Sequence, residues 1–308
     1  MALTRLIHTP QGFLRSMQMS RSTLFAFVEG KQHDPFVFGM LCSSVCSPRN
    51  VTYQICKANE LLGSSGGKTA LLTFHEYLRR RKALTTVLGG KTTHAIFFID
   101  KDIDDILRCQ RKCCHLVYTR YYDIQNDIFL NGRILEAVAA SASLDPRTLT
   151  PFFANGRSWC RIAAERWKDW VILCIIATLR CINHQCNYRV LSKVQCKSTG
   201  VPDSIKVNQM KLSLMAKCGF DAVTFERIYL SIKRKVTKIY NSGEQDRIFK
   251  GKWYPAILDE DVFRQFGNNC YNKKGFVTRI TSALALTLRA EDAWAQTYRL
   301  AIEHVLDN

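Results

Sequence analysis

No segment of this sequence is apolar for long enough to cross a lipid bilayer. The most apolar stretch, residues 171–179, ends at Arg180 and is shorter than the roughly 20 residues that a membrane-spanning helix needs. Residues 1–20 also lack a long apolar core followed by a small-residue cleavage site, so we expect no signal peptide. We therefore expect a cytoplasmic protein without a membrane partner, in which residues 171–179 form a buried helix.

The sequence also lacks paired Cys-x-x-Cys knuckles, although it contains 13 cysteines. Two clusters could suggest zinc, namely Cys109, Cys113, Cys114 and His115, and Cys181, His184, Cys186 and Cys196. A structural zinc site needs four ligands in closed geometry. Without export the thiols are expected to stay reduced, so buried cysteines that act as small apolar side chains are the favoured interpretation.

Acidic residues are scarce compared with basic ones. The sequence contains 26 Asp and Glu residues and 44 Lys and Arg residues, which gives a formal net charge of +18. Such an excess indicates a polyanionic partner, and nucleic acid is favoured over an acidic protein. The basic residues are interleaved with aromatic ones, which suits a single strand, and Lys233, Lys250 and Lys252 are candidate nucleic-acid ligands. Each basic run taken alone also fits a solvated helix face.

The first half of the chain alternates between strand and helix patterns. Short apolar, β-rich runs predict strands at 23–28, 51–56, 94–99 and 115–119. Helices are predicted at 35–46, with Asp34 as a possible N-cap, and at 66–84 after a glycine turn. Strands that alternate with helices predict an α/β fold with a mostly parallel sheet and flanking helices.

The second half shows few strand signals and several helical periods. Apolar residues recur at spacings of three and four from Phe225 to Ile239 and from Val277 to Leu288, a pattern that continues to Ile302. Asp145-Pro146 and Thr150-Pro151 punctuate the chain between these halves. We therefore predict a catalytic α/β domain at residues 1–142 and a helical domain at residues 143–308 for partner or nucleic-acid binding and dimerisation.

Acidic residues follow two of the predicted strands. Glu29 follows the run at 24–28, and Asp100, Asp102 and Asp104 follow the run at 95–99. Ligands of open α/β sheets bind beyond the carboxyl ends of the strands, and side chains two apart in an extended segment share one side. Converging carboxylates suit Mg²⁺, or Mn²⁺, and metal-assisted phosphodiester chemistry. The alternative is that these residues are only polar strand ends or helix caps.

Four motifs in order carry a resemblance to a known family. They are Val28-Glu29-Gly30-Lys31, Gly66-Gly67-Lys68, Ile99-Asp100-Lys101-Asp102 and Tyr121-Tyr122-Asp123-Ile124-Gln125-Asn126. Together they resemble TOPRIM-type domains, and most closely the AriB-like effectors encoded beside an AAA/ABC-type ATPase in the PARIS anti-phage systems of bacteria. The segment Phe249-Lys250-Gly251-Lys252-Trp253 is similar to a Gly-Lys element of the same group.

The resemblance implies a role for each matching residue. Glu29 matches the general acid/base and possible metal ligand, Asp100 and Asp102 match the metal ligands, with Asp104 as a further candidate, and Lys31 could neutralise phosphate charge. Two positions depart from the pattern. His33 stands where the family often has an aspartate, with Asp34 one residue later, and Gln125 stands where it often has a glutamate.

The function that the resemblance implies is a metal-dependent endonuclease toxin of phage defence. Such effectors attack RNA, tRNA in particular, after release from the partner ATPase, and we expect a homodimer once the chain is free. Two alternatives remain open: a DNA nuclease like the TOPRIM half of OLD-type proteins, and a non-catalytic TOPRIM-like adaptor of the ATPase.

Overall fold

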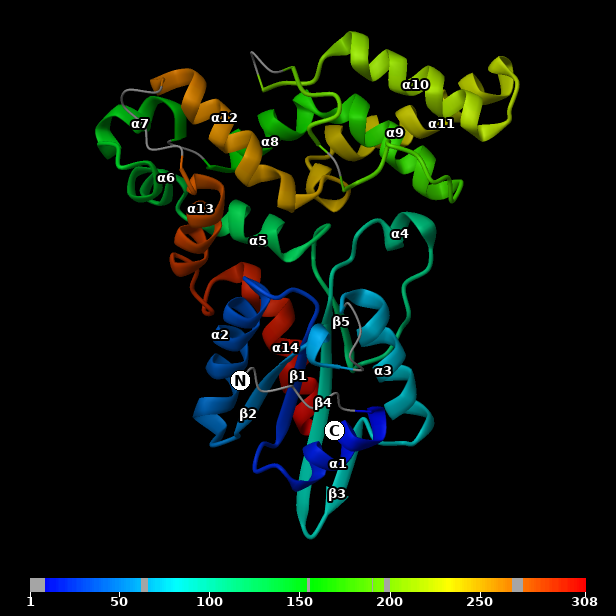
Figure 1. Cartoon of the computed structure of the whole chain (residues 1–308). Coiled ribbons are helices and arrows are strands. Elements are labelled where there is room, and N and C mark those ends of the chain that lie inside the picture. The colour runs from blue at the N-terminus through cyan, green and yellow to red at the C-terminus, as the bar shows by residue number, and fades with distance from the viewer. Residues whose placement is uncertain (1–8, 62–65, 154–155, 190, 197–199, 268–273) are drawn as a thin grey trace, which may run out of the picture. The chain divides into compact units, whose positions relative to one another are not determined.

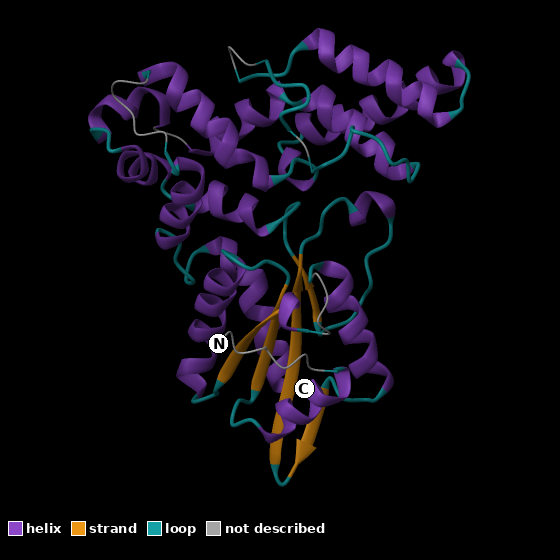
Figure 2. Ribbon diagram, in the orientation of Figure 1, coloured by secondary structure: helices purple, strands orange, loops and turns teal. Residues whose placement is uncertain are grey.

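The computed structural model describes residues 9–61, 66–153, 156–189, 191–196, 200–267 and 274–308. Internal contacts divide the chain into two compact units. Unit 1 comprises residues 1–101, 110–119 and 288–308, and unit 2 comprises residues 102–109 and 120–287. Unit 1 contains the β-sheet and unit 2 is helical (Figures 1 and 2), which confirms the predicted α/β class with a helical region after it.

The sheet of unit 1 is mostly parallel, as predicted. Its strands are β1 (Leu24–Val28), β2 (Tyr53–Lys57), β3 (Thr85–Leu88), β4 (Lys91–Ile99) and β5 (Leu116–Tyr118). The order is β2–β1–β4–β3, with β5 also paired to β4. β1 runs parallel to β2 and β4, and β5 runs parallel to β4, whereas β3 is antiparallel to β4. The four strands expected from the sequence are therefore present.

The antiparallel strand β3 was not predicted. The helix expected at 66–84 ends at Arg80, and the chain then forms β3 and turns back through two residues. Gly89 and Gly90 occupy this turn with φ values of 58° and 77°, which residues other than glycine rarely adopt. β3 pairs with the first part of β4 and β5 with its last part, so both lie along one edge of β4.

Helices cover both faces of the sheet. They are α1 (Pro10–Met19), α2 (Asp34–Cys46), α3 (Lys68–Arg80) and α14 (Gln296–Asp307), with short 3-10 turns at Ser47–Arg49, Ala58–Glu60 and Ala293–Ala295. Successive residues of a strand face opposite ways. Phe97 of β4 therefore packs with Phe74 of α3, while Phe98 stacks on Phe38 of α2, with 4.1 Å between ring centroids. α1 and α3 cover one face, and α2 and α14 cover the other (Figure 1).

The division into units differs from the predicted boundary after residue 142. Residues 120–142 belong to unit 2, and the last helix, α14, belongs to unit 1. The helical pattern that the sequence suggested from 277 to 302 is interrupted between Leu286 and Gln296. Tyr298 of α14 lies edge-on to Phe38, with 5.8 Å between ring centroids, so α14 completes the apolar cover of the sheet face that α2 begins.

Unit 2 is built from helices of different lengths. They are α4 (Asp104–Leu107), α5 (Ile124–Asn131), α6 (Ile134–Ala142), α7 (Pro146–Phe153), α8 (Gly156–Arg166), α9 (Lys168–Leu179), α10 (Ser204–Cys218), α11 (Ala222–Asn241), α12 (Tyr254–Phe266) and α13 (Phe276–Leu286), with 3-10 turns at Gln245–Arg247 and Gly251–Trp253. The helix predicted at 171–179 is confirmed, since α9 is buried from Trp170 to Ala177.

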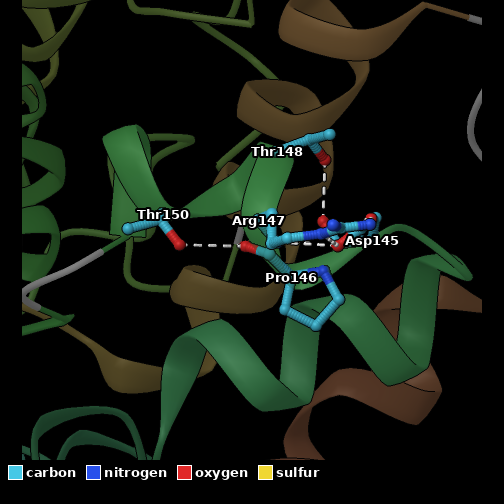
Figure 3. A network of polar contacts seen from close by, with 5 residues as sticks. All are labelled: Asp145, Pro146, Arg147, Thr148 and Thr150. Carbon is cyan, nitrogen blue, oxygen red and sulfur yellow. Dashed lines mark hydrogen bonds and ion pairs between the residues drawn. The ribbon is translucent and has the colours of Figure 1, made fainter.

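Asp145-Pro146, where the sequence predicted a break between domains, lies at the start of α7. The Asp145 carboxylate accepts hydrogen bonds from the backbone N–H and the guanidinium of Arg147, and its carbonyl oxygen accepts one from Thr148 Oγ1 at 2.7 Å (Figure 3). Thr150 Oγ1 donates to the Pro146 carbonyl at 3.0 Å. An aspartate that accepts from N–H groups at a helix start, followed by proline, is a helix N-terminal pattern. The Asp145-Pro146 step is therefore the start of a helix within unit 2 and does not separate two domains.

Candidate functional site

Glu29 and Asp100 come together at one edge of the sheet of unit 1. β1 and β4 are parallel neighbours, with Val28 opposite Phe98, so both strands end at the same edge. Glu29 follows the last residue of β1, and Asp100 follows the last residue of β4. The backbone N–H of Asp100 donates to Oε2 of Glu29 at 3.3 Å, and Asp100 is only 3% exposed. The two positions therefore lie together at this edge, joined by a bond from the backbone of Asp100, and a shared role for their carboxylates stays a prediction.

The turn after Glu29 is fixed by Asp34. Asp34 is buried and is the first residue of α2, and its Oδ2 accepts the backbone N–H of Gly30 at 2.7 Å. A Cβ atom on Gly30 would lie 2.5 Å from Cγ of Asp34, so a side chain at position 30 would displace this carboxylate. Asp34 is therefore not the N-cap that the sequence suggested, because His33 occupies the N-cap position of α2. Lys31 follows Gly30 and is exposed.

Lys68 places a positive charge at the end of β4. It is the first residue of α3, after Gly67 at the N-cap with φ 81°, and its Nζ donates to the carbonyl oxygen of Asp100 at 2.8 Å. A longer hydrogen bond of 3.4 Å reaches the carbonyl of Lys101. The sequence reasoning did not name Lys68 as a site residue. The Gly66-Gly67 pair just before a helix was the available signal, because such a turn positions the first helical side chain.

The segment from Asp102 onward departs from the extended geometry that the sequence suggested. Asp102 has a φ of 52°, and Asp104 opens the short helix α4. Both belong to unit 2, whereas Asp100 belongs to unit 1. The expected alternation of Asp100, Asp102 and Asp104 along one extended wall is therefore wrong, because the chain enters the left-handed region at Asp102, which aspartate tolerates.

Contacts within unit 2 hold this segment. The backbone N–H of Asp102 donates to the carbonyl of Tyr122 at 2.7 Å. Asp105 pairs with Arg247 at 2.7 Å, and burial leaves only 16% of the Asp105 side chain exposed. Arg247 also pairs with Glu244 at 2.8 Å. These bonds join the start of α4 to the turn at 245–247.

The segments at 121–126 and 249–253 of unit 2 take part in one buried network. Asp123 caps α5, and its side chain accepts the N–H of Asn126. Asn126 Nδ2 donates to Oδ1 of Asp246 at 3.0 Å and to the carbonyl of Phe249 at 3.0 Å, and its Oδ1 accepts the N–H of Gly251 at 3.1 Å. The motif at 121–126 and the segment at 249–253 therefore contact each other through buried polar groups.

Asp246 lies at the centre of this network. Its pKa is raised by burial, although hydrogen bonds from Tyr254, Asn126 and Gln245 oppose this effect. Tyr254 Oη donates to Asp246 Oδ1 at 2.6 Å. Gln125 is also buried, and its Oε1 has no hydrogen-bond partner in the described part of the chain. Sequence reasoning did not identify Asp246, because buried partners that are distant in sequence leave no local pattern.

The lysines expected to bind nucleic acid have different surroundings. Lys250 is partly buried, and its Nζ donates to the carbonyl of Tyr188 at 3.0 Å. Lys252 and Lys233 are exposed, and the Nζ of Lys233 lies 6.0 Å from the ring centroid of Tyr229. The bond ties Lys250 to the backbone of unit 2, and Lys233, Lys250 and Lys252 all stay predicted nucleic-acid ligands.

The described cysteines are free thiols. Six of them are buried, namely Cys42, Cys46, Cys56, Cys160, Cys174 and Cys186, and burial raises the pKa of each. A raised pKa keeps these thiols protonated and unreactive. Of the predicted clusters, Cys109, Cys114 and Cys181 are exposed.

Two carboxylates on neighbouring strand ends offer the oxygen ligands that Mg²⁺ favours. Mg²⁺ commonly binds through one or two carboxylates together with waters and substrate phosphates. Glu29 and Asp100 fit that requirement. Within the described ranges, no group of three or more His, Cys, Asp or Glu side chains could hold a metal ion.

Comparison with protein-family models finds no family that matches this chain, and comparison with curated proteins finds no matching protein. Among the described residues, no helix is long and apolar enough to span a membrane.

Proposed function

We propose that this chain is a metal-dependent TOPRIM-like endonuclease that cleaves RNA, with tRNA as the preferred substrate. The observation that carries the proposal is the pairing of Glu29 with Asp100 at the carboxyl ends of two adjacent parallel strands. The motif resemblance and the net charge of +18 add support for a nucleic-acid substrate. The same resemblance supports a role as a toxin of anti-phage defence that a partner ATPase holds inactive and releases as a homodimer.

Each of these residues has a separate role in the proposed reaction. The Asp100 N–H orients the Glu29 carboxylate, so that Glu29 can accept a proton from the attacking nucleophile. The Asp34 contact to Gly30 keeps the turn that carries Glu29 in one conformation. The ammonium of Lys68 and the nearby Lys31 supply positive charge that favours a phosphate. Mg²⁺ or Mn²⁺, when bound by Glu29 and Asp100, would polarise the phosphate and stabilise the leaving oxygen.

A cleavage assay with isosteric variants tests the proposal. Purified full-length chain is incubated with total tRNA, with Mg²⁺ or with EDTA, beside Glu29→Gln and Asp100→Asn. Asn at position 100 keeps the backbone N–H that Glu29 accepts, and Gln at position 29 keeps an oxygen acceptor, so each variant changes only the carboxylate chemistry. Glu291→Gln, at an exposed position of unit 1, is the matched control.

We expect discrete cuts that require metal, with a loss of about 100-fold or more in both site variants and none in the control. If plasmid or single-stranded DNA were cut and tRNA were not, the chain would be a DNA nuclease. If the wild type and the variants were equally inert on all substrates, with the partner ATPase present or absent, the nuclease proposal would be wrong and the adaptor would be favoured.

A further inference from the structure

A basic groove lies along α3, within unit 1. It has a volume of about 570 Å³. Its lining consists of Thr69, Leu72, Thr73, Glu76, Tyr77, Arg80, Arg81 and Arg111. Three arginines face one glutamate in this lining, and the exposed Arg79 and Lys82 lie next to it in the sequence. The groove is therefore a concentrated positive surface.

Two arginines of the groove, Arg80 and Arg81, have side-chain partners within the protein before any ligand binds. Glu76 accepts hydrogen bonds of 2.8 Å from Arg79 and from Nε of Arg80. These bonds lower the pKa of Glu76 to about 2, so the carboxylate stays ionised and continues to anchor both arginines. The guanidinium of Arg81 lies 4.9 Å from the ring centroid of Tyr77. The backbone N–H of Arg111 donates to Oη of Tyr118 at 3.1 Å, which fixes the backbone that carries the third arginine. Side chains positioned in advance lose less entropy on binding.

The chemistry of the groove favours a nucleic-acid strand over an acidic protein. Guanidinium groups bind phosphate oxygens in a bidentate manner and also present flat faces on which bases can stack. Arg81 presents such a face, because Tyr77 supports it and Tyr77 in turn stacks on Phe74 at 6.2 Å between centroids. Thr69 and Thr73 add hydroxyl groups to the lining. Leu72 and Tyr77 give the lining apolar surface beside the arginines, which suits the faces of bases.

The groove leads toward the carboxylate pair. Thr69 in its lining directly follows Lys68, whose Nζ contacts the carbonyl of Asp100. Thr69 and Arg81 are separated by 12 positions along α3 and its end, which corresponds to ~18 Å at 1.5 Å per residue. A strand that occupied the groove would therefore run from the arginines to the end of β4 where Glu29 and Asp100 meet.

We infer that the α3 groove, through Arg80, Arg81 and Arg111, binds the phosphodiester backbone of a single nucleic-acid strand and directs it to the Glu29–Asp100 site. The inference deepens the proposed nuclease function and rests on it for the position of the cut. Binding to the groove itself is measured without catalysis.

The test is fluorescence anisotropy with a labelled single-stranded RNA in EDTA, over a series of salt concentrations. The protein is the full chain with Glu29→Gln, so that no strand is cut. The groove variant combines Arg80→Gln, Arg81→Gln and Arg111→Gln, which remove charge from side chains at the surface. The matched control combines Arg15→Gln, Arg21→Gln and Arg289→Gln, three exposed arginines of unit 1 that do not line the groove.

Loss of three phosphate contacts should lower the slope of log Kd against log salt by about 2, since each contact to a single strand contributes about 0.7. At about 0.1 M salt this corresponds to a Kd about 100-fold weaker for the groove variant. The control should bind within a few-fold of the parent, because its three arginines lie outside the lining of the groove and would make no phosphate contact there. Circular dichroism of both variants verifies that they are folded.

Equal binding by the groove variant and the control would overturn the inference. Competition by polyglutamate as strong as that by unlabelled RNA would also overturn it, and would assign the groove to an acidic protein partner. A chain that bound RNA through the groove but cut no substrate would refute the proposed nuclease and leave the binding site standing. The two failures are thus distinguishable.

Discussion

The buried histidine of α3 gives unit 1 a specific sensitivity to acid. His75 is 2% exposed, and neither of its ring nitrogens has a hydrogen-bond partner among the described residues. Its ring lies edge-on to Phe97, with 5.3 Å between centroids. Burial lowers the pKa of His75 to about 4, and the positive charges of His115 and Arg111 contribute to this shift, while Glu76 opposes it.

Proton linkage gives both the sign and the magnitude of the change in the free energy of unfolding with pH. Between pH 6.5 and about 4 the unfolded chain binds a proton at His75 and the folded chain does not. The free energy of unfolding therefore falls as the pH falls through this window. The shift from 6.5 to about 4 corresponds to a loss on the order of 3 kcal/mol below the window, and to about 2 kcal/mol by pH 5.

His75→Leu removes the titration at similar side-chain volume. Hydrogen exchange of the β4 amides measures the stability of unit 1 in the wild type and in this variant, at about pH 7 and about pH 5. At the higher pH the variant should be as stable as the wild type or more so, because two buried polar atoms without partners are lost. At the lower pH the free energy of unfolding of unit 1 should be about 2 kcal/mol lower in the wild type than in the variant, relative to their difference at the higher pH.

Two features make this comparison specific. His94, whose pKa burial also lowers, is present in both proteins, so the difference between them isolates His75. His304→Leu, at an exposed position of α14, should follow the wild type at both pH values. An equal loss of protection in the wild type and in His75→Leu would refute the reasoning.

Two further substitutions test the site and the buried network. Gly30→Ala should reduce cleavage by about 100-fold, because the new Cβ would displace Asp34 and shift Glu29. Gly39→Ala, which would contact Ile55 at an ordinary 3.8 Å, should cleave like the wild type, and equal rates for both variants would contradict the fixed-turn argument. Tyr254→Phe should destabilise unit 2 by about 1–3 kcal/mol in hydrogen exchange of α12, since it removes the 2.6 Å bond to Asp246. Tyr229→Phe keeps the ring that Lys211 contacts and should have little effect, so similar losses in both tyrosine variants would exclude a special role for this bond.

The parallel core of the sheet could be predicted because its strands are buried on both faces. β1 and the second half of β4 are continuous apolar runs that end at acidic residues, and those ends locate Glu29 and Asp100. β3 could also have been found, since Gly89-Gly90 between β-branched segments is a hairpin signal. The prediction missed it because the expected helix ended at residue 84 and the next expected strand began at residue 94, which left residues 85–93 unassigned.

Other features depend on tertiary contacts that no local pattern encodes. α14 returns to the sheet by packing Tyr298 against the buried ring of Phe38 on α2, and residues 38 and 298 are far apart in the sequence. Aspartate can adopt the left-handed conformation seen at Asp102, but it adopts extended conformations as well. An extended strand end was therefore an equally good expectation. Lys68 gains its place in the site only when α3 packs beside the end of β4.

The central claim is that Glu29 and Asp100 act as one catalytic site, and a double-mutant comparison tests it most directly. Cleavage rates of tRNA are measured for Glu29→Gln, Asp100→Asn and the combined variant under the same Mg²⁺ concentration. Residues that act as a unit have strongly non-additive effects, so the combined variant should be no slower than the slower single variant. Rate losses that multiply, or an Asp100→Asn chain that cuts tRNA like the wild type, would contradict the account.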